Sequence, residues 1–163
     1  MKLQAPSDKT LHLPAGVWSD GKRLVVVDRN NSRVLIWREV PTSDFQPANV
    51  VLGQSDFTHV VFNDGNSLPT DRTLNLPYNG VSSNGVQLAI ADTDNNRVLI
   101  WNSFPDTNFK AADVVLGQSD FAHANEETAS ERTLNHPTGV LFYRDKLLVV
   151  DGGNSRVLIF NSK

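Results

Sequence analysis

Carboxylate and guanidinium side chains recur in this chain at a fixed spacing of five residues. The pairs are Asp28 with Arg33, Asp92 with Arg97, and Asp151 with Arg156. Paired charges of this kind occur in active sites, but a catalytic site needs one special copy, and here all three are alike. We therefore interpret the pairs as a structural repeat signature, in which each carboxylate ends a strand and forms a bidentate pair with a guanidinium between neighbouring units.

Histidine is the usual metal ligand and near-neutral base, and the chain contains four. His59 and His123 occupy equivalent positions, each two residues after an identical heptapeptide, Val-Leu-Gly-Gln-Ser-Asp-Phe. His12 and His136 instead differ from their counterparts elsewhere in the chain. These two residues are the candidates for a metal ligand or base, with a packing or surface role as the alternative.

One segment resembles a calcium-binding loop, because Asp92 to Asn96 places oxygen ligands at alternate positions. It lacks the glycine and the bidentate glutamate of such a loop, and Asn and Asp are also typical of turns. The sequence contains no Ser/His/Asp arrangement, no His-Glu-x-x-His motif and no phosphate-binding glycine loop. We expect no catalytic residue and no cofactor, and a bound calcium or zinc ion stays the alternative.

Composition is that of an ordinary globular chain, with 163 residues, 39% hydrophobic and 20% charged. The net charge of −3 gives no electrostatic reason to expect nucleic acid, and no basic run suggests an anionic membrane. The absence of cysteine excludes disulfides and thiolate metal sites. We expect a soluble protein without a signal peptide, whose compartment the sequence leaves open.

The charged pairs belong to a unit that occurs three times. In each copy, a segment rich in Val, Ile and Leu ends in Asp, a polar turn follows, and a second apolar segment begins with Arg. The copies span 24–37, 88–101 and 147–160, and their aspartates recur at intervals of 64 and 59 residues. Such repetition indicates one supersecondary unit per repeat, stabilised by stacking on its neighbours.

The apolar segments are short and separated by turn residues, which predicts strands. In the second copy we expect strands over 80–83, 87–91, 97–101 and 113–118, with a type I′ turn at Asn84-Gly85. The first copy repeats this pattern with a fourth strand over 49–54, whereas the third copy ends after its third strand. The second and third strands are apolar on both faces and no covering helix is predicted. Small antiparallel sheets packed face to face around an axis, a β-propeller, satisfy both conditions.

The repeat resembles the NHL repeat of six-bladed propellers. Its pattern is Pro-x-Gly-Val, then Leu-x-Val-x-Asp, then Asn-x-Arg-Val-Leu-Ile and an aromatic residue. The first copy contains it as Pro14, Gly16-Val17, Asp28, Asn31, Arg33 and Trp37. The resemblance implies an all-β propeller of three NHL-like blades with four-stranded antiparallel sheets, the third blade lacking its outer strand. The expected blades cover about 11–73, 74–133 and 134–163.

Three blades make half of the ring that this family usually closes. Residues 8–14 match the segments 71–77 and 131–137 that precede the second and third blades. The edge strand at 156–160 is left unpaired, and the spare strand candidate is residues 1–4. We therefore expect a homodimer that completes a six-bladed ring, in which residues 1–4 of a partner chain complete the third blade. A fragment of a longer propeller is the alternative.

Propellers host many unrelated activities, so the fold alone does not identify the function. We expect a binding or interaction scaffold whose ligand is a protein, a carbohydrate or a small molecule, and neither nucleic acid nor membrane as partner. The second hypothesis is an enzyme, because some similar six-bladed propellers are metal-dependent lyases or lactone hydrolases. It requires His12, His136 and channel-facing carboxylates to converge on one metal.

Overall fold

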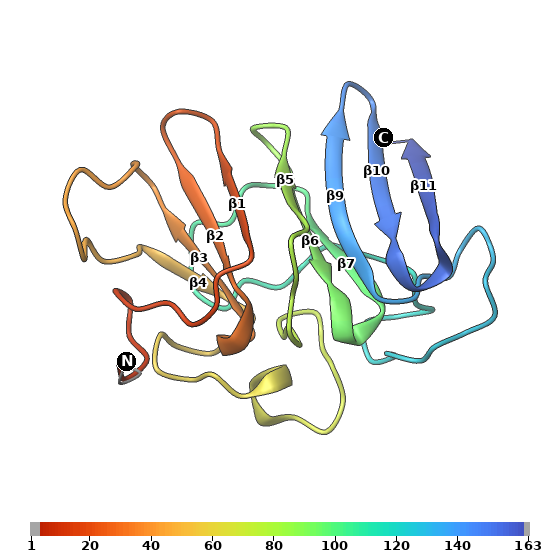
Figure 1. The fold of residues 1–163 in the computed structure, drawn as a ribbon, viewed down its shortest axis with the longest axis horizontal. Coiled ribbons are helices and arrows are strands. Elements are labelled where there is room, and N and C mark those ends of the chain that lie inside the picture. Colours follow the sequence, from red (N-terminus) through yellow and green to blue (C-terminus); the bar gives the residue numbers. More distant parts are fainter. Residues whose placement is uncertain (1–3, 162–163) are drawn as a thin grey trace.

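The chain folds into three antiparallel sheets, each formed by consecutive strands (Figure 1). The computed structural model describes residues 4–161. The first sheet contains β1 (Gly16–Ser19), β2 (Leu24–Asp28), β3 (Arg33–Trp37) and β4 (Val50–Leu52). The second contains β5 (Val81–Ser83), β6 (Leu88–Asp92), β7 (Arg97–Trp101) and β8 (Val114–Leu116). The third contains β9 (Pro137–Tyr143), β10 (Lys146–Asp151) and β11 (Arg156–Asn161). The all-β prediction is confirmed, as is the absence of a fourth strand in the third sheet among the described residues.

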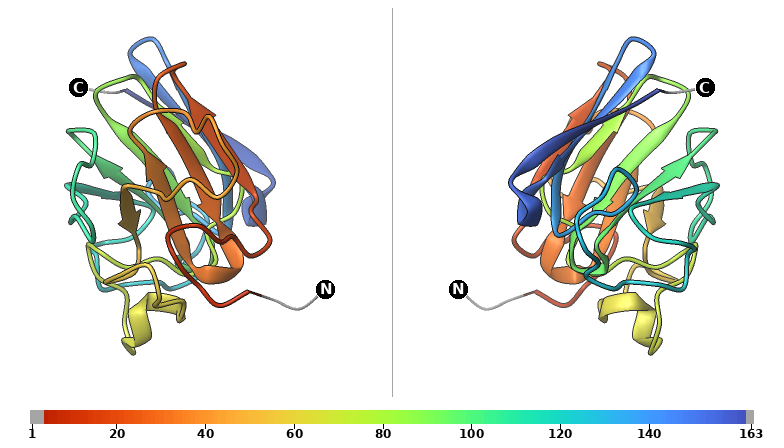
Figure 2. Two further views of the ribbon diagram at one scale, coloured as in Figure 1. Left: turned by 90° about the vertical axis from the view of Figure 1, so that its left-hand side faces the viewer. Right: turned by 90° about the vertical axis from the view of Figure 1, so that its right-hand side faces the viewer.

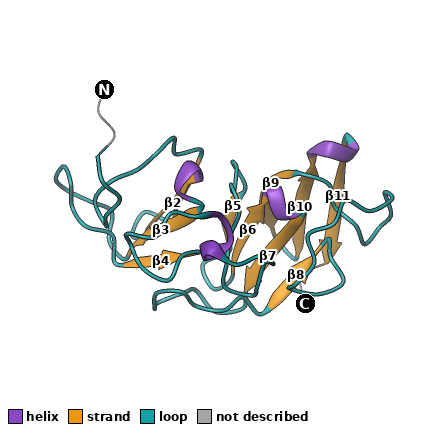
Figure 3. Cartoon of the chain, turned by 90° about the horizontal axis from the view of Figure 1, so that it is seen from below, coloured by secondary structure: helices purple, strands orange, loops and turns teal. Residues whose placement is uncertain are grey.

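Each polar turn between the second and third strands of a sheet forms a single turn of 3₁₀ helix. These helices are η1 (Arg29–Asn31), η3 (Thr93–Asn95) and η4 (Gly152–Asn154), and a further one, η2 (Phe62–Gly65), lies in the connection between the first two sheets. Figure 3 shows η1, η3 and η4 at one end of their sheets. The charged pairs flank them, so all three pairs lie at that end.

The predicted type I′ turn at Asn84-Gly85 is wrong. That turn requires positive φ at both central residues; Gly85 has φ 94°, but Asn84 lies outside the left-handed region. The Asn84 carboxamide instead accepts hydrogen bonds from the backbone N–H groups of Val86 and Gln87, at 3.0 and 2.8 Å. The side chain therefore closes the turn locally, which removes the need for a second left-handed residue. The fourth strands are also shorter than predicted.

Neighbouring sheets pack face to face, and their first strands contact one another, β1 with β5 and β5 with β9. We call the face of a sheet that is directed toward the next sheet along the chain its forward face, and the opposite one its backward face. The forward face of the first sheet and the backward face of the second form one buried cluster, which contains Val25, Val27, Val34, Ile36, Leu88, Ile90, Leu99 and Trp101. A second cluster joins the next pair of sheets through Ala89, Val98, Ile100, Leu147 and Val149. The expectation that the strands are apolar on two buried faces is met fully in β3, β6 and β7.

Three leucines at equivalent repeat positions differ in burial because their neighbours differ. Leu74 and Leu134 are 0% and 1% exposed, whereas Leu11 is 42% exposed. Leu74 packs on Gly53 and Leu134 packs on Gly117, just beyond the fourth strand of the preceding sheet, so closely that a Cβ on either glycine would overlap the leucine. Among residues 4–161 no sheet precedes the first one, so Leu11 has no such contact there.

We predict that Leu74→Ala and Leu134→Ala each lower the free energy of unfolding by about 2–5 kcal/mol, because each leaves a cavity between sheet and connection. Leu11→Ala is the matched control, since the same residue type in the same repeat position is exposed. Its expected loss is below about 1 kcal/mol. Chemical denaturation followed by tryptophan fluorescence measures all three, and similar losses throughout would contradict the packing described here.

Candidate functional site

The aspartate of each charged pair is a buried acceptor at the end of the second strand of its sheet. Asp92 is fully buried, and its carboxylate accepts hydrogen bonds from Arg97 Nε at 2.8 Å, Asn95 Nδ2 at 2.8 Å and the Asn75 backbone N–H at 2.7 Å. The same three contacts recur around Asp28 and Asp151. Burial raises the pKa of Asp92, and the Arg97 charge and the amide donors oppose that rise.

The predicted bidentate pairing between units is wrong, because each ion pair lies within one sheet. Asp92 and Arg97 are cross-strand partners, and only Nε of the guanidinium contacts the carboxylate. The terminal nitrogens of Arg97 donate instead to the backbone carbonyls of Thr70, Thr73 and Phe121, at 2.9, 2.9 and 2.6 Å. These carbonyls belong to the connections before and after the sheet. One buried guanidinium therefore holds both connections against the β6–β7 hairpin.

Arg156 in the third sheet makes fewer of these contacts. It pairs with Asp151 at 2.7 Å and donates to the carbonyls of Ser130 and Thr133. Nη1 of Arg33 donates to the Phe57 carbonyl and Nη1 of Arg97 to that of Phe121. The part of the chain that the structure describes supplies no such carbonyl for Arg156, whose side chain is 26% exposed.

We predict that Arg97→Lys lowers the free energy of unfolding by about 2–4 kcal/mol, because an ammonium group cannot reach all four acceptors of this buried node. Arg156→Lys removes a less buried guanidinium with fewer contacts, and we expect about 1 kcal/mol. Urea denaturation of both variants at pH 7 provides the comparison. Equal losses would mean that the additional carbonyl contact and the burial of Arg97 contribute nothing.

The structure gives His12 and His136 separate surroundings. His12 takes part in the hydrogen bonding of Asp28 through its backbone. Its N–H donates to the Asp28 carboxylate at 2.6 Å, as the equivalent N–H of Asn75 does to Asp92. His136 is exposed, and its Nδ1 lies 2.6 Å from the side-chain oxygen of Asn135. Within residues 4–161 no hydrogen bond or ion pair joins the two histidines. No cluster of three His, Cys, Asp or Glu side chains that could hold a metal is found in that range either.

His59 and His123 each face the aspartate that ends the repeated heptapeptide. The ring nitrogen Nδ1 lies 3.1 Å from Asp56 in the first case and 2.6 Å from Asp120 in the second. The Thr58 hydroxyl is the main group that holds the pKa of Asp56 below its usual range, and the His123 ring does the same for the pKa of Asp120. Both His–Asp pairs lie in exposed turns that are held by local hydrogen bonds.

The largest departure from the repeat pattern is the forward face of the third sheet. Val157 and Ile159 in β11 are 56% and 61% exposed, whereas the equivalent residues of the first sheet, Val34 and Ile36, are 0% and 1% exposed. Leu141, Tyr143 and Val150 extend the exposed surface across β9 and β10. Several exposed apolar side chains on one sheet face are uncommon on a folded protein, where exposed apolar residues are usually scattered singly.

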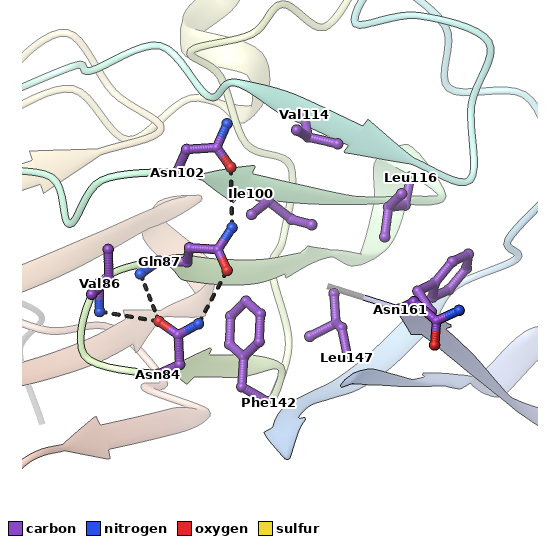
Figure 4. A pocket seen from close by; sticks show the side chains of 11 residues that line it. Asn84, Val86, Gln87, Ile100, Asn102, Val114, Leu116, Phe142, Leu147 and Asn161 are labelled. Carbon is purple, nitrogen blue, oxygen red and sulfur yellow. Dashed lines mark hydrogen bonds between the residues drawn. The ribbon is translucent and has the colours of Figure 1, made fainter. Parts of the chain in front are cut away.

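A groove opens between the second sheet and the third, beside the open edge of β11 (Figure 4). Its volume is about 950 Å³. Its floor is apolar, with Ile100, Leu116, Phe142, Leu147 and Phe160. Its rim carries the amides of Asn84, Gln87, Asn102 and Asn161. Gln87 accepts a hydrogen bond from Asn84 at 3.0 Å and donates one to Asn102 at 3.1 Å, which orders one side of the rim. An apolar floor with a few polar groups is typical of a binding site.

The corresponding space between the first and second sheets is filled by Phe104, from the loop that follows β7. Its ring lies 5.8 Å from the ring of Trp18, and the Arg23 guanidinium lies 3.7 Å from the ring centre. Asp20 positions Arg23 through its carboxylate. The carboxylate accepts one hydrogen bond from Arg23 Nε at 2.8 Å and another from the Arg23 backbone N–H at 2.7 Å. These bonds, the backbone bond above all, lower the pKa of Asp20 from 3.8 to about 2.

We predict that Asp20→Asn reduces stability at neutral pH and that the difference from the parent chain disappears in acid. A folded-state pKa below the unfolded value stabilises the fold above the unfolded pKa, and this contribution is lost as the pH falls through the folded one. The difference is therefore full above about pH 4 and decreases toward about pH 2. Denaturation of both proteins across this range measures it, and a constant difference would contradict the assignment.

No protein-family model matches the chain, and neither does any curated protein. No helix among the described residues is both long and apolar enough to cross a membrane. The resemblance to NHL repeats therefore stays a prediction, and the site must be interpreted from its geometry.

Sequence reasoning identified the charged pairs and the open third sheet but did not identify the groove. One signal was present in the repeat alignment. Phe142 stands where the first two copies have Ser19 and Ser83, which places an aromatic side chain at a position that is otherwise small and polar. The groove itself depends on which loop covers which strand, and that relation appears only in three dimensions.

Proposed function

We propose that this chain is half of a six-bladed NHL-like β-propeller, and that it acts as a non-catalytic binding scaffold after assembly into a homodimer. The exposed forward face of the third sheet carries the proposal. In the first and second sheets the same face is covered by the next sheet along the chain. The third sheet repeats that apolar pattern at Val150, Val157 and Ile159, all of them exposed.

The surface that would fit it is the part of the backward face of the first sheet that lies beside Leu35 and Trp37, which are themselves already buried. Leu24 and Val26 are only partly buried, and Val17 in β1 is exposed, whereas its equivalent in β5, Val81, is buried against the first sheet. The third sheet of one copy would therefore meet the first sheet of another through the packing already used twice within the chain. Two such contacts related by a two-fold axis close six sheets into a ring.

The sequence hypothesis that residues 1–4 of a partner complete the third blade stays a prediction, because residues 1–3 lie outside the described part of the chain. The ligand of such a scaffold would be a protein, a carbohydrate or a small molecule. The apolar groove with its amide rim favours a ligand that offers aromatic or aliphatic groups together with backbone-like hydrogen-bonding groups.

Substitution of the exposed forward face tests the assembly. We predict that the parent chain sediments at twice its 18.0 kDa. Ile159→Glu places a charge in both contacts of the ring, and we expect it to raise the dissociation constant of the dimer about a hundredfold or more. Leu68→Glu, at an exposed leucine in the connection between the first two sheets, is the control and should leave the mass unchanged. A parent chain that is monomeric at all concentrations would overturn the proposal.

A further inference from the structure

We infer that the groove between the second and third sheets and the open edge of β11 bind an extended peptide with the chemistry of this chain's own residues 102–121. The inference rests on the binding role proposed above and does not require the dimer, and it assigns the edge of β11 to this peptide in place of residues 1–4 of a partner chain. It follows from what occupies the equivalent space between the first and second sheets.

In that space, the loop over residues 102–113 covers the outer edge of the first sheet. The Phe109 backbone N–H donates to the Val51 carbonyl at 2.8 Å, and the Val51 N–H donates to the Asn108 side chain at 3.1 Å. Figure 2 shows this loop, in teal, on the same side of the molecule as β4. With this cover β4 is fully buried, whereas its counterpart β8 is only partly buried. The edge of β8 therefore lacks the segment that covers β4.

The groove also lacks the aromatic side chain that fills its counterpart. The Phe104 ring contacts the Trp18 ring of β1 at a tilt of 37°, and the Arg23 guanidinium of the β1–β2 turn lies over the Phe104 ring. The residue equivalent to Arg23 in the second sheet is Gln87, and it lines the open cavity of about 950 Å³. The cavity is therefore situated where a third copy of this phenylalanine would lie.

The outer edge of β11 also lacks a hydrogen-bonded neighbouring strand in the described chain. Leu158 corresponds to Leu99, which is paired with Val115 of β8, yet in the described chain β11 pairs with β10 alone. Among the described residues, Arg156 Nη1 likewise has no counterpart of the Phe121 carbonyl. Residues 4–161 therefore supply neither a strand, nor an aromatic side chain, nor a carbonyl at these three places.

The segment 102–121 contains all three groups, with Phe104 for the groove, Val114–Leu116 for the edge and the Phe121 carbonyl for the guanidinium. A strand of four residues, such as the predicted contribution of residues 1–4, is long enough to pair with β11 but not to reach the groove as well. The occupant is therefore an extended segment of about twenty residues, with an aromatic side chain ten positions before an apolar strand. Strand addition with a side-chain anchor is an established mode of peptide recognition.

A synthetic peptide with the sequence of residues 102–121 and a fluorescent label at its N-terminus is the probe. Titration with the full chain, followed by fluorescence anisotropy, should give saturable one-to-one binding. The same peptide with Phe104→Ala should bind about tenfold or more weakly, because the groove then stays empty. In the protein, Gln87→Arg should tighten binding of the parent peptide about threefold, because it restores the cation that stacks on the aromatic ring. It should have no effect on the Phe104→Ala peptide.

Absence of saturable binding at about 1 mM chain, or equal binding of a scrambled peptide, would overturn the inference. So would a Phe104→Ala peptide that binds as well as the parent. Sedimentation of the same samples separates this result from the assembly. Peptide binding to a monomeric chain would support the inference while contradicting the dimer, and a dimer that binds no peptide would overturn the inference alone. Dissociation of the dimer by the peptide would assign the groove to a second copy of the chain and overturn the inference in this form.

Discussion

Each sheet of this protein carries apolar side chains on both faces, and both faces must be removed from water. Within the chain this requirement is satisfied for the second sheet, which has a neighbour on each side. Val98 and Leu99 are adjacent in β7, point to opposite faces and are both completely buried. The first and third sheets each have one neighbour in the chain. On the free face of the first sheet Leu35 and Trp37 are buried against Ala48 and Val51. The sequence pattern and the surroundings therefore disagree most on the free face of the third sheet, where Val150, Val157 and Ile159 are exposed.

The charged pairs fix the geometry that makes this stacking regular. In each sheet a buried aspartate joins the hairpin to the start of its own repeat, and the arginine opposite it binds carbonyls of the preceding connection. In the first two sheets the arginine also binds a carbonyl of the following connection. A guanidinium is suited to this role because it offers five donors in one plane. The connections are thereby held at the same place in every repeat. The position of each sheet relative to the next follows from these contacts and from the apolar cluster between them.

Much of this architecture could be predicted, because it depends on residues close together in the sequence. The strands over Leu24–Asp28 and Arg33–Trp37 follow from runs of β-branched and aliphatic residues bounded by polar turns. The chemistry of a turn is less predictable, as Asn84 shows, because a side-chain hydrogen bond can replace a backbone conformation. Burial was not predictable at equivalent positions. Leu11 and Leu74 stand at the same repeat position in similar local sequences, but in the described chain a sheet precedes only Leu74.

The site is less predictable than the fold for the same reason. His12 and His136 were chosen because they differ from their repeat counterparts, but a departure from a repeat does not say where the side chain lies. His12 contributes a backbone N–H that any residue except proline supplies. The groove, in contrast, arises from the absence of a covering segment. Residues that are absent leave no pattern in a sequence, and only comparison with the filled space around Phe104 reveals what would occupy it.

Disulfide trapping tests most directly whether the third sheet of one copy meets the first sheet of another. The chain contains no cysteine, so a double variant with Val17→Cys and Leu141→Cys introduces the only thiols, both at exposed positions on β1 and β9. A closed dimer predicts that oxidation converts this variant to a covalent species of twice the chain mass and nothing larger, while neither single variant cross-links to a comparable extent. A ladder of higher multiples would contradict closure at two copies. Cross-linking of the double variant no greater than that of the single variants would contradict the contact itself.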